Sequence, residues 1–201
     1  MTYSYRTKGG YIPAFVLGSN FWFDILGKTN RERGGRATVR TKAITEDSLN
    51  AILRCLTPTN RLVCLVALAS GLRITDVLNI RTEQLAKDRF TVFESKTGKK
   101  KVVRLPRDLR RRVAAQAGKV FAFENRLNGL KHRSRTTVWK DLNRVAKIFK
   151  LKGLAPHSMR KTYAKTLRAH GLTEAEVQQA MNHSSPAITR LYTMADELAL
   201  R

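Results

Sequence analysis

The sequence has few cysteines and no apolar run long enough to cross a membrane. Its only two cysteines, Cys55 and Cys64, lie within apolar helical patterns. This placement is typical of reduced thiols that pack as small hydrophobic side chains in a cytosolic protein, so we assign them no chemistry. A bilayer span needs about 18 apolar residues in succession. The longest candidate, residues 11–26, is interrupted by Pro13, Gly18, Asn20 and Asp24, and we expect neither a signal peptide nor an anchor.

Patterns typical of metal sites are also lacking. No group of carboxylates has the spacing of a two-metal nuclease, and no set of Cys and His has that of a zinc site. We therefore expect chemistry that uses no metal and no other cofactor.

Acidic residues are scarce relative to basic ones. The chain has 39 Lys and Arg against 15 Asp and Glu, which gives a net charge of +24, although 42% of its residues are hydrophobic. A folded chain this basic repels itself unless a polyanion neutralises it. Nucleic acid is the commonest such partner for a cytosolic domain, with a membrane surface as the lesser alternative.

The positive charge is distributed unevenly along the chain. Residues 87–112 hold eleven basic and three acidic side chains, and residues 131–165 hold eleven and one, whereas residues 171–201 hold two and four. A surface that served solubility alone would mix the signs. We infer a binding face built from the middle of the chain.

A chain of 201 residues suits one globular domain with an appended arm. Residues 1–42 contain a cluster of aromatics and a basic run, 31–40, without sustained periodicity, and we interpret them as an N-terminal arm. The aromatics could pack on the domain or on a partner, and the basic run could follow a DNA backbone; partial disorder is an equal alternative. Residues 43–201 form the domain with a short C-terminal tail.

Hydrophobic periodicity predicts a mainly α domain with a small antiparallel β-sheet, an α+β fold. Apolar positions three and four apart, with capping residues and glycine stops, predict helices, and alternation on both sides of Gly98 predicts a hairpin. The predicted helices cover residues 45–56, 60–70, 74–80, 107–117, 134–150, 156–169 and 173–180, with another from residue 185, and the hairpin strands cover 90–95 and 101–105.

Three short motifs contain the candidate catalytic residues. They are Arg73 with Asp76 three positions later, His157 with Arg160, and His183 with Tyr192 nine positions later. In this order they resemble the motifs of the tyrosine recombinase (phage integrase) family. Residues 95–99, Ser-Lys-Thr-Gly-Lys, are similar to the hairpin that presents the family's catalytic lysine. One motif alone would be weak evidence, but four in order over about residues 43–195 are a specific signal.

The resemblance implies the fold of the tyrosine recombinase catalytic domain and the function of a site-specific DNA recombinase. Such an enzyme cleaves and rejoins DNA strands through a covalent 3′-phosphotyrosyl intermediate. The resemblance also implies double-stranded DNA as the substrate and a homotetramer on two paired sites. The implied setting is the bacterial cytoplasm or nucleoid, with a phage or mobile element as one alternative origin.

Each residue type suits this chemistry. Arginine donates bidentately to phosphate and stays protonated, so Arg73 and Arg160 are predicted to hold the scissile phosphate. Tyr192 needs a base or a cationic site, because the pKa of an unperturbed tyrosine is ~10. His157 and His183 could each donate a hydrogen bond or take the proton. The resemblance implies that His157 assists proton removal and that His183 mainly binds the phosphate.

Other side chains are expected to assist. The 5′ oxygen would leave as an alkoxide, so a general acid on a mobile loop is expected, and Lys96 fits that role, with the three lysines that follow in the loop as competitors. Asp76 could hold the Arg73 guanidinium or form an ordinary surface ion pair. The expected DNA-backbone contacts are Lys99, Lys100, Lys101, Arg104, Arg135, Lys140, Arg144 and Lys161.

The sequence also departs from the family. A helical domain usually precedes the catalytic one, but only about 42 residues precede it here. This predicts weaker intrinsic DNA affinity or reliance on partners, such as accessory DNA-bending proteins. Asn182 stands where the family usually has glycine, and Lys161 where a histidine is common.

Two alternatives stay open at this point. A type IB topoisomerase uses similar arginine, lysine, histidine and tyrosine groups but relaxes DNA instead of exchanging strands. A basic helix-turn-helix DNA-binding protein could be formed by residues 157–180, although the second helix has no Lys or Arg and begins with two acidic residues.

Overall fold

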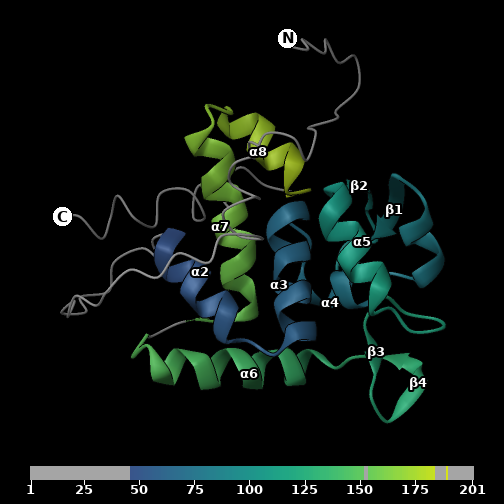
Figure 1. Cartoon of the computed structure of the whole chain (residues 1–201). Helices are drawn as coiled ribbons and strands as arrows, with labels where there is room; N and C mark the ends of the chain where they lie inside the picture. The colour runs from purple at the N-terminus through teal and green to yellow at the C-terminus, as the bar shows by residue number, and fades with distance from the viewer. Residues whose placement is uncertain (1–45, 152–153, 184–188, 190–201) are drawn as a thin grey trace.

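A predominantly apolar helix occupies the centre of the structure (Figure 1). In this computed structural model, which describes residues 46–151, 154–183 and 189, helix α3 (Pro58–Ser70) is buried at every position from residue 62 to residue 70. Pro58 suits the first turn because the missing N–H has no partner there. Gly71 ends the helix with φ +66°, in the left-handed conformation that glycine adopts without strain. The predicted central helix and its glycine stop are confirmed.

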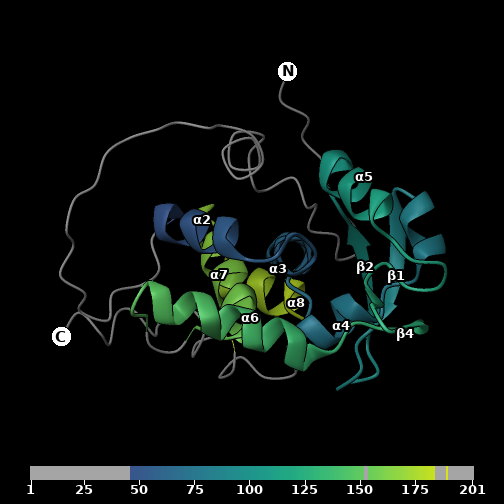
Figure 2. The same ribbon diagram turned by 60° about the horizontal axis from the view of Figure 1, so that its bottom comes forward.

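Five helices pack against α3. They are α2 (Glu46–Cys55), α4 (Ile74–Leu78), α5 (Arg107–Ala115), α6 (Arg135–Ile148) and α7 (Pro156–Ala169). Figures 1 and 2 show α2 and α7 on one side of α3 and α5 on the other, while α6 crosses one end. The apolar stripe of α6 predicted to be core is buried at Val138, Leu142 and Val145. Helix and sheet contents agree with the predicted α+β class.

A two-stranded antiparallel sheet lies beside α5 (Figure 2). Strands β1 (Arg89–Phe93) and β2 (Lys100–Arg104) pair from Arg89 opposite Arg104 to Phe93 opposite Lys100. The short 3₁₀ helix η2 (Thr82–Ala86) leads into β1. Phe90, Val92 and Val103 face the core, whereas Phe93 is 68% exposed. The predicted hairpin is confirmed, and its turn carries the lysines of residues 96–99.

A second hairpin escaped prediction. Strands β3 (Glu124–Asn125) and β4 (Asn128–His132) pair next to the buried Phe123. Residues 124–132 contain no β-branched residue and no apolar alternation, so the period that predicts strands is missing. Leu127 and Leu130 are largely exposed on this hairpin.

Helix α8 (Glu174–Ala180) follows α7 after Gly171. The predicted capping box is present, because the Thr173 N–H and hydroxyl both donate to the Glu176 carboxylate and the Glu176 N–H donates to the Thr173 hydroxyl. A small apolar cluster joins the two helices at Tyr163, Ala164, Leu167, Val177 and Met181. The arm falls outside the described residues, as does the helix expected from residue 185 except for Thr189, which is helical. Within the described part of the chain, no helix is both long and apolar enough to span a bilayer.

Gly71→Ala should destabilise the fold strongly. A β-carbon at φ +66° would lie 2.4 Å from the Tyr163 ring, which is itself buried. Gly171→Ala is the matched control, since its φ is +84° but nothing lies within 4 Å of the added atom. Chemical denaturation should show a loss of about 1 kcal/mol for the control and at least about twice that for Gly71→Ala. Equal losses would contradict the role given to the Tyr163 contact.

Candidate active site

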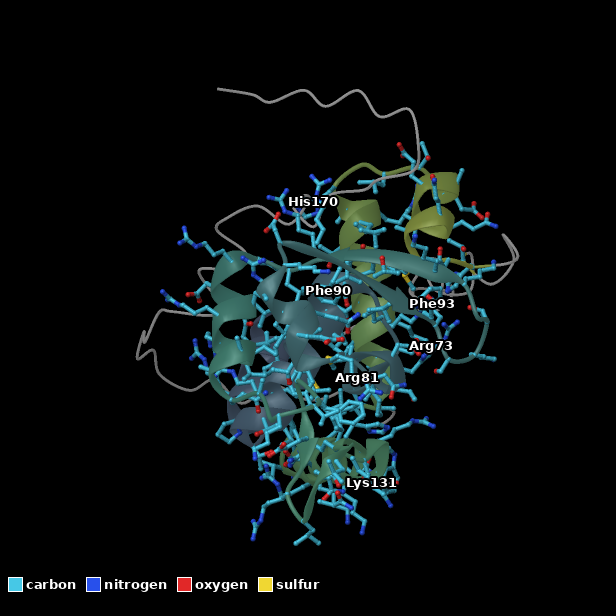
Figure 3. The ribbon with its side chains drawn as sticks, turned by 90° about the vertical axis from the view of Figure 1, so that its right-hand side faces the viewer. Arg73, Arg81, Phe90, Phe93, Lys131 and His170 are labelled. Carbon is cyan, nitrogen blue, oxygen red and sulfur yellow. The ribbon has the colours of Figure 1, made fainter. Side chains whose placement is uncertain are left out.

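Two arginines from distant parts of the chain approach one buried carboxylate. Arg73 lies at the N-terminus of α4, and its Nη1 donates to Glu94 Oε2 at 2.6 Å. Arg160 lies in the second turn of α7, with its Nη1 3.9 Å from Glu94 Oε1. Figure 3 shows Arg73 beside the end of β1 that Phe93 marks. The structure therefore brings together the two arginines predicted to hold a phosphate.

Arg160 is almost completely buried, with 1% of its surface exposed. Its Nη1 donates to the Gly71 carbonyl and its Nη2 to the Met181 carbonyl. The first carbonyl ends α3 and the second follows α8. The guanidinium thus links the three helices α3, α7 and α8 and fixes its own position among them.

Glu94 is the site residue that the sequence interpretation missed. Only 1% of it is exposed, at the position where β1 ends. Burial alone would raise the pKa of its carboxyl, but the hydrogen bond and charge of Arg73, together with the Thr97 hydrogen bond and the charge of Arg160, hold the pKa below the usual value. Strand alternation could have revealed it, because Phe90, Val92 and residue 94 share the core-facing side of β1.

Asp76 is arranged differently from the expectation that it holds Arg73. Its nearest approach to the guanidinium is 3.9 Å, whereas its Oδ1 accepts hydrogen bonds from Ser95 N at 2.8 Å and Ser95 Oγ at 2.6 Å. Asp76 is fully buried and secures the start of the hairpin turn. Glu94, which lies nearer to Arg73, accepts the hydrogen bond from its guanidinium group.

The turn that carries Lys96 is built on Glu94. The Glu94 carbonyl accepts from Thr97 N at 3.2 Å and from Gly98 N at 2.8 Å, and the Glu94 N–H donates to the Lys99 carbonyl at 3.0 Å. The Thr97 hydroxyl also donates to Glu94 Oε2 at 3.0 Å. Lys96 itself is exposed in this turn.

His183 lies just after α8 and is 9% exposed. Its backbone N–H donates to the Gln178 carbonyl. In its side chain, the ring Nδ1 is 3.0 Å from Thr189 Oγ1. Burial, followed by the positive charges of Arg160 and Arg73, lowers the pKa of the ring from 6.5 to about 4. The histidine is therefore neutral at pH 7 and can hydrogen-bond without adding charge.

His157 is the second residue of α7 and lies at the surface. Its pKa is also lowered, by partial burial first and then by the charges of Arg160 and Lys161. Both predicted histidines thus lie within the electric field of the same arginine.

Lys101 does not extend into solvent as a phosphate contact would. Its Nζ donates to the Ala180 carbonyl at 2.7 Å and lies 5.6 Å from the centre of the Tyr163 ring. Burial, followed by the charge of Arg160, lowers the pKa of the ammonium group from 10.5 to about 7. It faces inward because residue 101 is on the side of β2 that packs toward α7 and α8. The side chain therefore joins the sheet to the end of α8.

The remaining predicted DNA contacts form two groups. Two already bind protein atoms: Arg104 pairs with Asp88 at 3.1 Å, and Arg144 binds Asp141 at 2.7 Å and the Cys55 carbonyl at 2.6 Å. The others are exposed and comprise Lys99, Lys100, Arg135, Lys140 and Lys161. These exposed side chains are accessible to a polyanion.

Tyr192 lies outside the described residues, so its side chain is not part of this geometry. The described groups can nevertheless bind an oxyanion, since two guanidinium groups are fixed beside neutral and cationic donors. Glu94 approaches both arginines, and the Asp76 carboxylate lies 3.9 Å from Arg73, so two buried carboxylates hold the two guanidinium groups in place.

Comparison with known proteins assigns this arrangement to a family. Residues 42–198 match the model of the phage integrase family. The chain is 26% identical over 163 residues to the tyrosine recombinase XerA of Thermococcus kodakarensis, which covers 76% of this chain and 57% of the relative. It is 30% identical over 132 residues to the probable integrase/recombinase YoeC of Bacillus subtilis, covering 64% of this chain and 73% of the relative. The chain thus spans a little over half the length of the XerA relative.

Solved structures have the same fold. The crystal structure of XerA recombinase superposes with a TM-score of 0.63 at 19% identity, covering 86% of this chain and 65% of that one. A lambda integrase dimer bound to a COC′ core site gives a TM-score of 0.61 at 19% identity, covering 80% of this chain and 62% of that one. The expected tyrosine recombinase catalytic-domain fold is confirmed.

The buried His183 should make stability depend on pH. Between pH 6.5 and about 4 the unfolded chain binds a proton that folded His183 does not, so stability falls as the pH falls through this window. His183→Gln should flatten the dependence, as measured by urea denaturation at a series of pH values. His170→Gln, at an exposed position, is the matched control and should keep the wild-type slope. Identical slopes for all three proteins would contradict the prediction.

Proposed function

The chain belongs to the phage integrase family, and from this premise we propose that it is a site-specific DNA recombinase that works through a 3′-phosphotyrosyl intermediate. The observation that carries the proposal is the approach of Arg73 and Arg160 to one buried carboxylate. Two fixed guanidinium groups suit the charge that grows on the non-bridging oxygens of a scissile phosphate. Double-stranded DNA is the proposed substrate.

Tyr192 is the proposed nucleophile. Its oxygen forms a bond to phosphorus while the bond from phosphorus to the 5′ oxygen breaks. The phenolic proton passes to a neighbouring base, for which His157 is the candidate, and the phosphate stays attached to the enzyme. The energy of the broken bond is kept in the new ester, so reversal by a 5′ hydroxyl reseals the strand.

Lys96 is the proposed general acid. A proton from its ammonium group passes to the departing 5′ oxygen, which would otherwise leave as a strongly basic alkoxide. The exposed turn can bring this lysine to DNA that lies across the site. His183, neutral because its pKa is about 4, would donate a hydrogen bond to the phosphate. Asp76 would hold the turn at Ser95 instead of acting on Arg73 directly.

Assembly and location are further parts of the proposal. Recombination requires four protomers on two paired sites, with accessory DNA-bending proteins where intrinsic affinity is low. Residues 1–42 would follow the DNA backbone as a basic arm. The bacterial cytoplasm or nucleoid is the proposed location.

The alternatives are less favoured. The relatives and structural neighbours described above are recombinases and integrases, which does not favour a topoisomerase. The helix-turn-helix alternative needs α8 to enter a DNA groove, yet α8 begins with Glu174 and Glu176 and has no basic residue. It would also leave the approach of Arg73 and Arg160 to one carboxylate unexplained.

Tyr192→Phe should abolish formation of a covalent protein–DNA adduct. The substrate is a nicked duplex that carries the mapped binding site, incubated in chelator, and the adduct is detected on a denaturing gel. Binding should survive, because only the nucleophilic oxygen is removed. Tyr11→Phe, outside the motifs, is the matched control and should form the adduct as the wild type does. A full yield of adduct from Tyr192→Phe would overturn the proposal.

Exchange between two sites should distinguish recombination from relaxation. A supercoiled plasmid with two copies of the mapped site is expected to yield recombinant products. A plasmid without the site should keep its supercoils, because cleavage requires protomers assembled on paired sites. Rapid relaxation of the second plasmid with no exchange on the first would favour the topoisomerase alternative.

A further inference from the structure

One carboxylate oxygen connects the phosphate-binding arginine to the turn of the hairpin. Glu94 Oε2 accepts from Arg73 Nη1 at 2.6 Å and from Thr97 Oγ1 at 3.0 Å. The Glu94 side chain is buried, so its carboxylate depends on these two donors rather than on water. A displacement of the guanidinium therefore changes the hydrogen bond to Thr97.

Lys96 is held on both sides by carboxylates. The residue before it, Ser95, is bound through its N–H and hydroxyl to Asp76 Oδ1. The residue after it, Thr97, is bound through its hydroxyl to the Glu94 side chain and through its N–H to the Glu94 carbonyl. The backbone that carries Lys96 is thereby tied to α4 on one side and to Arg73 on the other.

Arg73 can serve a phosphate while it keeps this contact. A guanidinium group has five N–H donors in a rigid plane. The contact with Glu94 engages Nη1 and so orients the plane in which the other donors lie. A phosphate that accepts hydrogen bonds from those donors therefore binds the same rigid guanidinium group that Glu94 orients.

We propose that Glu94 is a positioning residue that couples phosphate binding by Arg73 to the placement of Lys96, through the hydrogen bond from Thr97 to the shared carboxylate oxygen. This inference rests on the proposed function. It gives Glu94 and Thr97 a part in the departure of the 5′ oxygen that requires neither of them to touch the DNA.

The test uses two nicked DNA substrates that differ in one atom. In one, the bridging atom of the scissile phosphate is the natural 5′ oxygen; in the other it is sulfur. A thiolate leaves without a proton, because the pKa of a thiol is far lower than that of an alcohol, about 8.5 for cysteine. A defect in placing the general acid is therefore seen with oxygen and disappears with sulfur.

Thr97→Val is the central variant, because it removes the hydroxyl donor and keeps the shape of an exposed side chain. Its rate of adduct formation should fall about tenfold with the oxygen substrate, a fraction of what a general acid contributes. Its rate with sulfur should equal the wild-type rate. Thr97→Ser, which keeps the hydroxyl, should restore the oxygen rate. Thr82→Val makes the same change at a hydroxyl that binds the Gly118 carbonyl, remote from the site, and should cleave both substrates normally.

Glu94→Gln extends the test to the carboxylate. It weakens the contacts with both Arg73 and Thr97, so cleavage should slow with both substrates, and sulfur should recover only part of the loss. Thermal unfolding of each variant is measured alongside. If Glu94→Gln fails to fold, Thr97→Val, whose change lies at the surface, still decides the question.

The outcomes distinguish a failure of the proposed role of Glu94 from a failure of the proposed function. A wild-type protein that forms no adduct with either substrate defeats the proposed function, and the inference with it. A wild-type protein that forms the adduct, with Thr97→Val equally fast on oxygen, defeats the inference alone. Equal slowing of Thr97→Val on oxygen and sulfur also defeats it, because the defect would then lie outside proton delivery.

Discussion

The ion pair between the partly buried Arg73 and the buried Glu94 is the interaction on which the site depends. The two groups are 2.6 Å apart, and separating them is energetically costly because the Glu94 carboxylate would be left charged and buried. This constraint fixes the end of β1 against the start of α4. It also keeps a cation at the place where a substrate phosphate is expected, with Arg160 held nearby by the ends of α3 and α8.

The rest of the architecture serves to bring these ends together. Arg160 and Lys101 donate to the consecutive carbonyls of Met181 and Ala180, so α7 and the sheet both hold the last turn of α8. His183 follows that turn directly. A histidine and an arginine from two of the motifs and a lysine from β2 thus share one junction, which suits a chemistry in which positioning and charge do most of the catalysis.

Much of this could be predicted from the sequence. Helices α2 to α8 and the β1–β2 hairpin follow from apolar periodicity, caps and glycine stops, and the spacing of the motifs identified the two arginines. The roles of Asp76 and Lys101 could not be predicted, because spacing places Asp76 near Arg73 but does not show that Glu94 lies closer. Strand alternation indicates that Glu94 is buried, but it does not indicate that Glu94 binds Arg73. Likewise, within the run of lysines at residues 99–101, the sequence does not show that Lys101 is the one that faces inward. The β3–β4 hairpin lacked the alternation that would have indicated it.

Gly71 is a position at which a single substitution would affect both the fold and the active site. Its left-handed backbone ends the central helix, its missing side chain makes room for the Tyr163 ring, and its carbonyl receives Arg160. The same residue therefore ends the central helix and positions an arginine of the active site. A replacement at this position would impair folding and the placement of Arg160 together, so stability and activity cannot be tuned independently there.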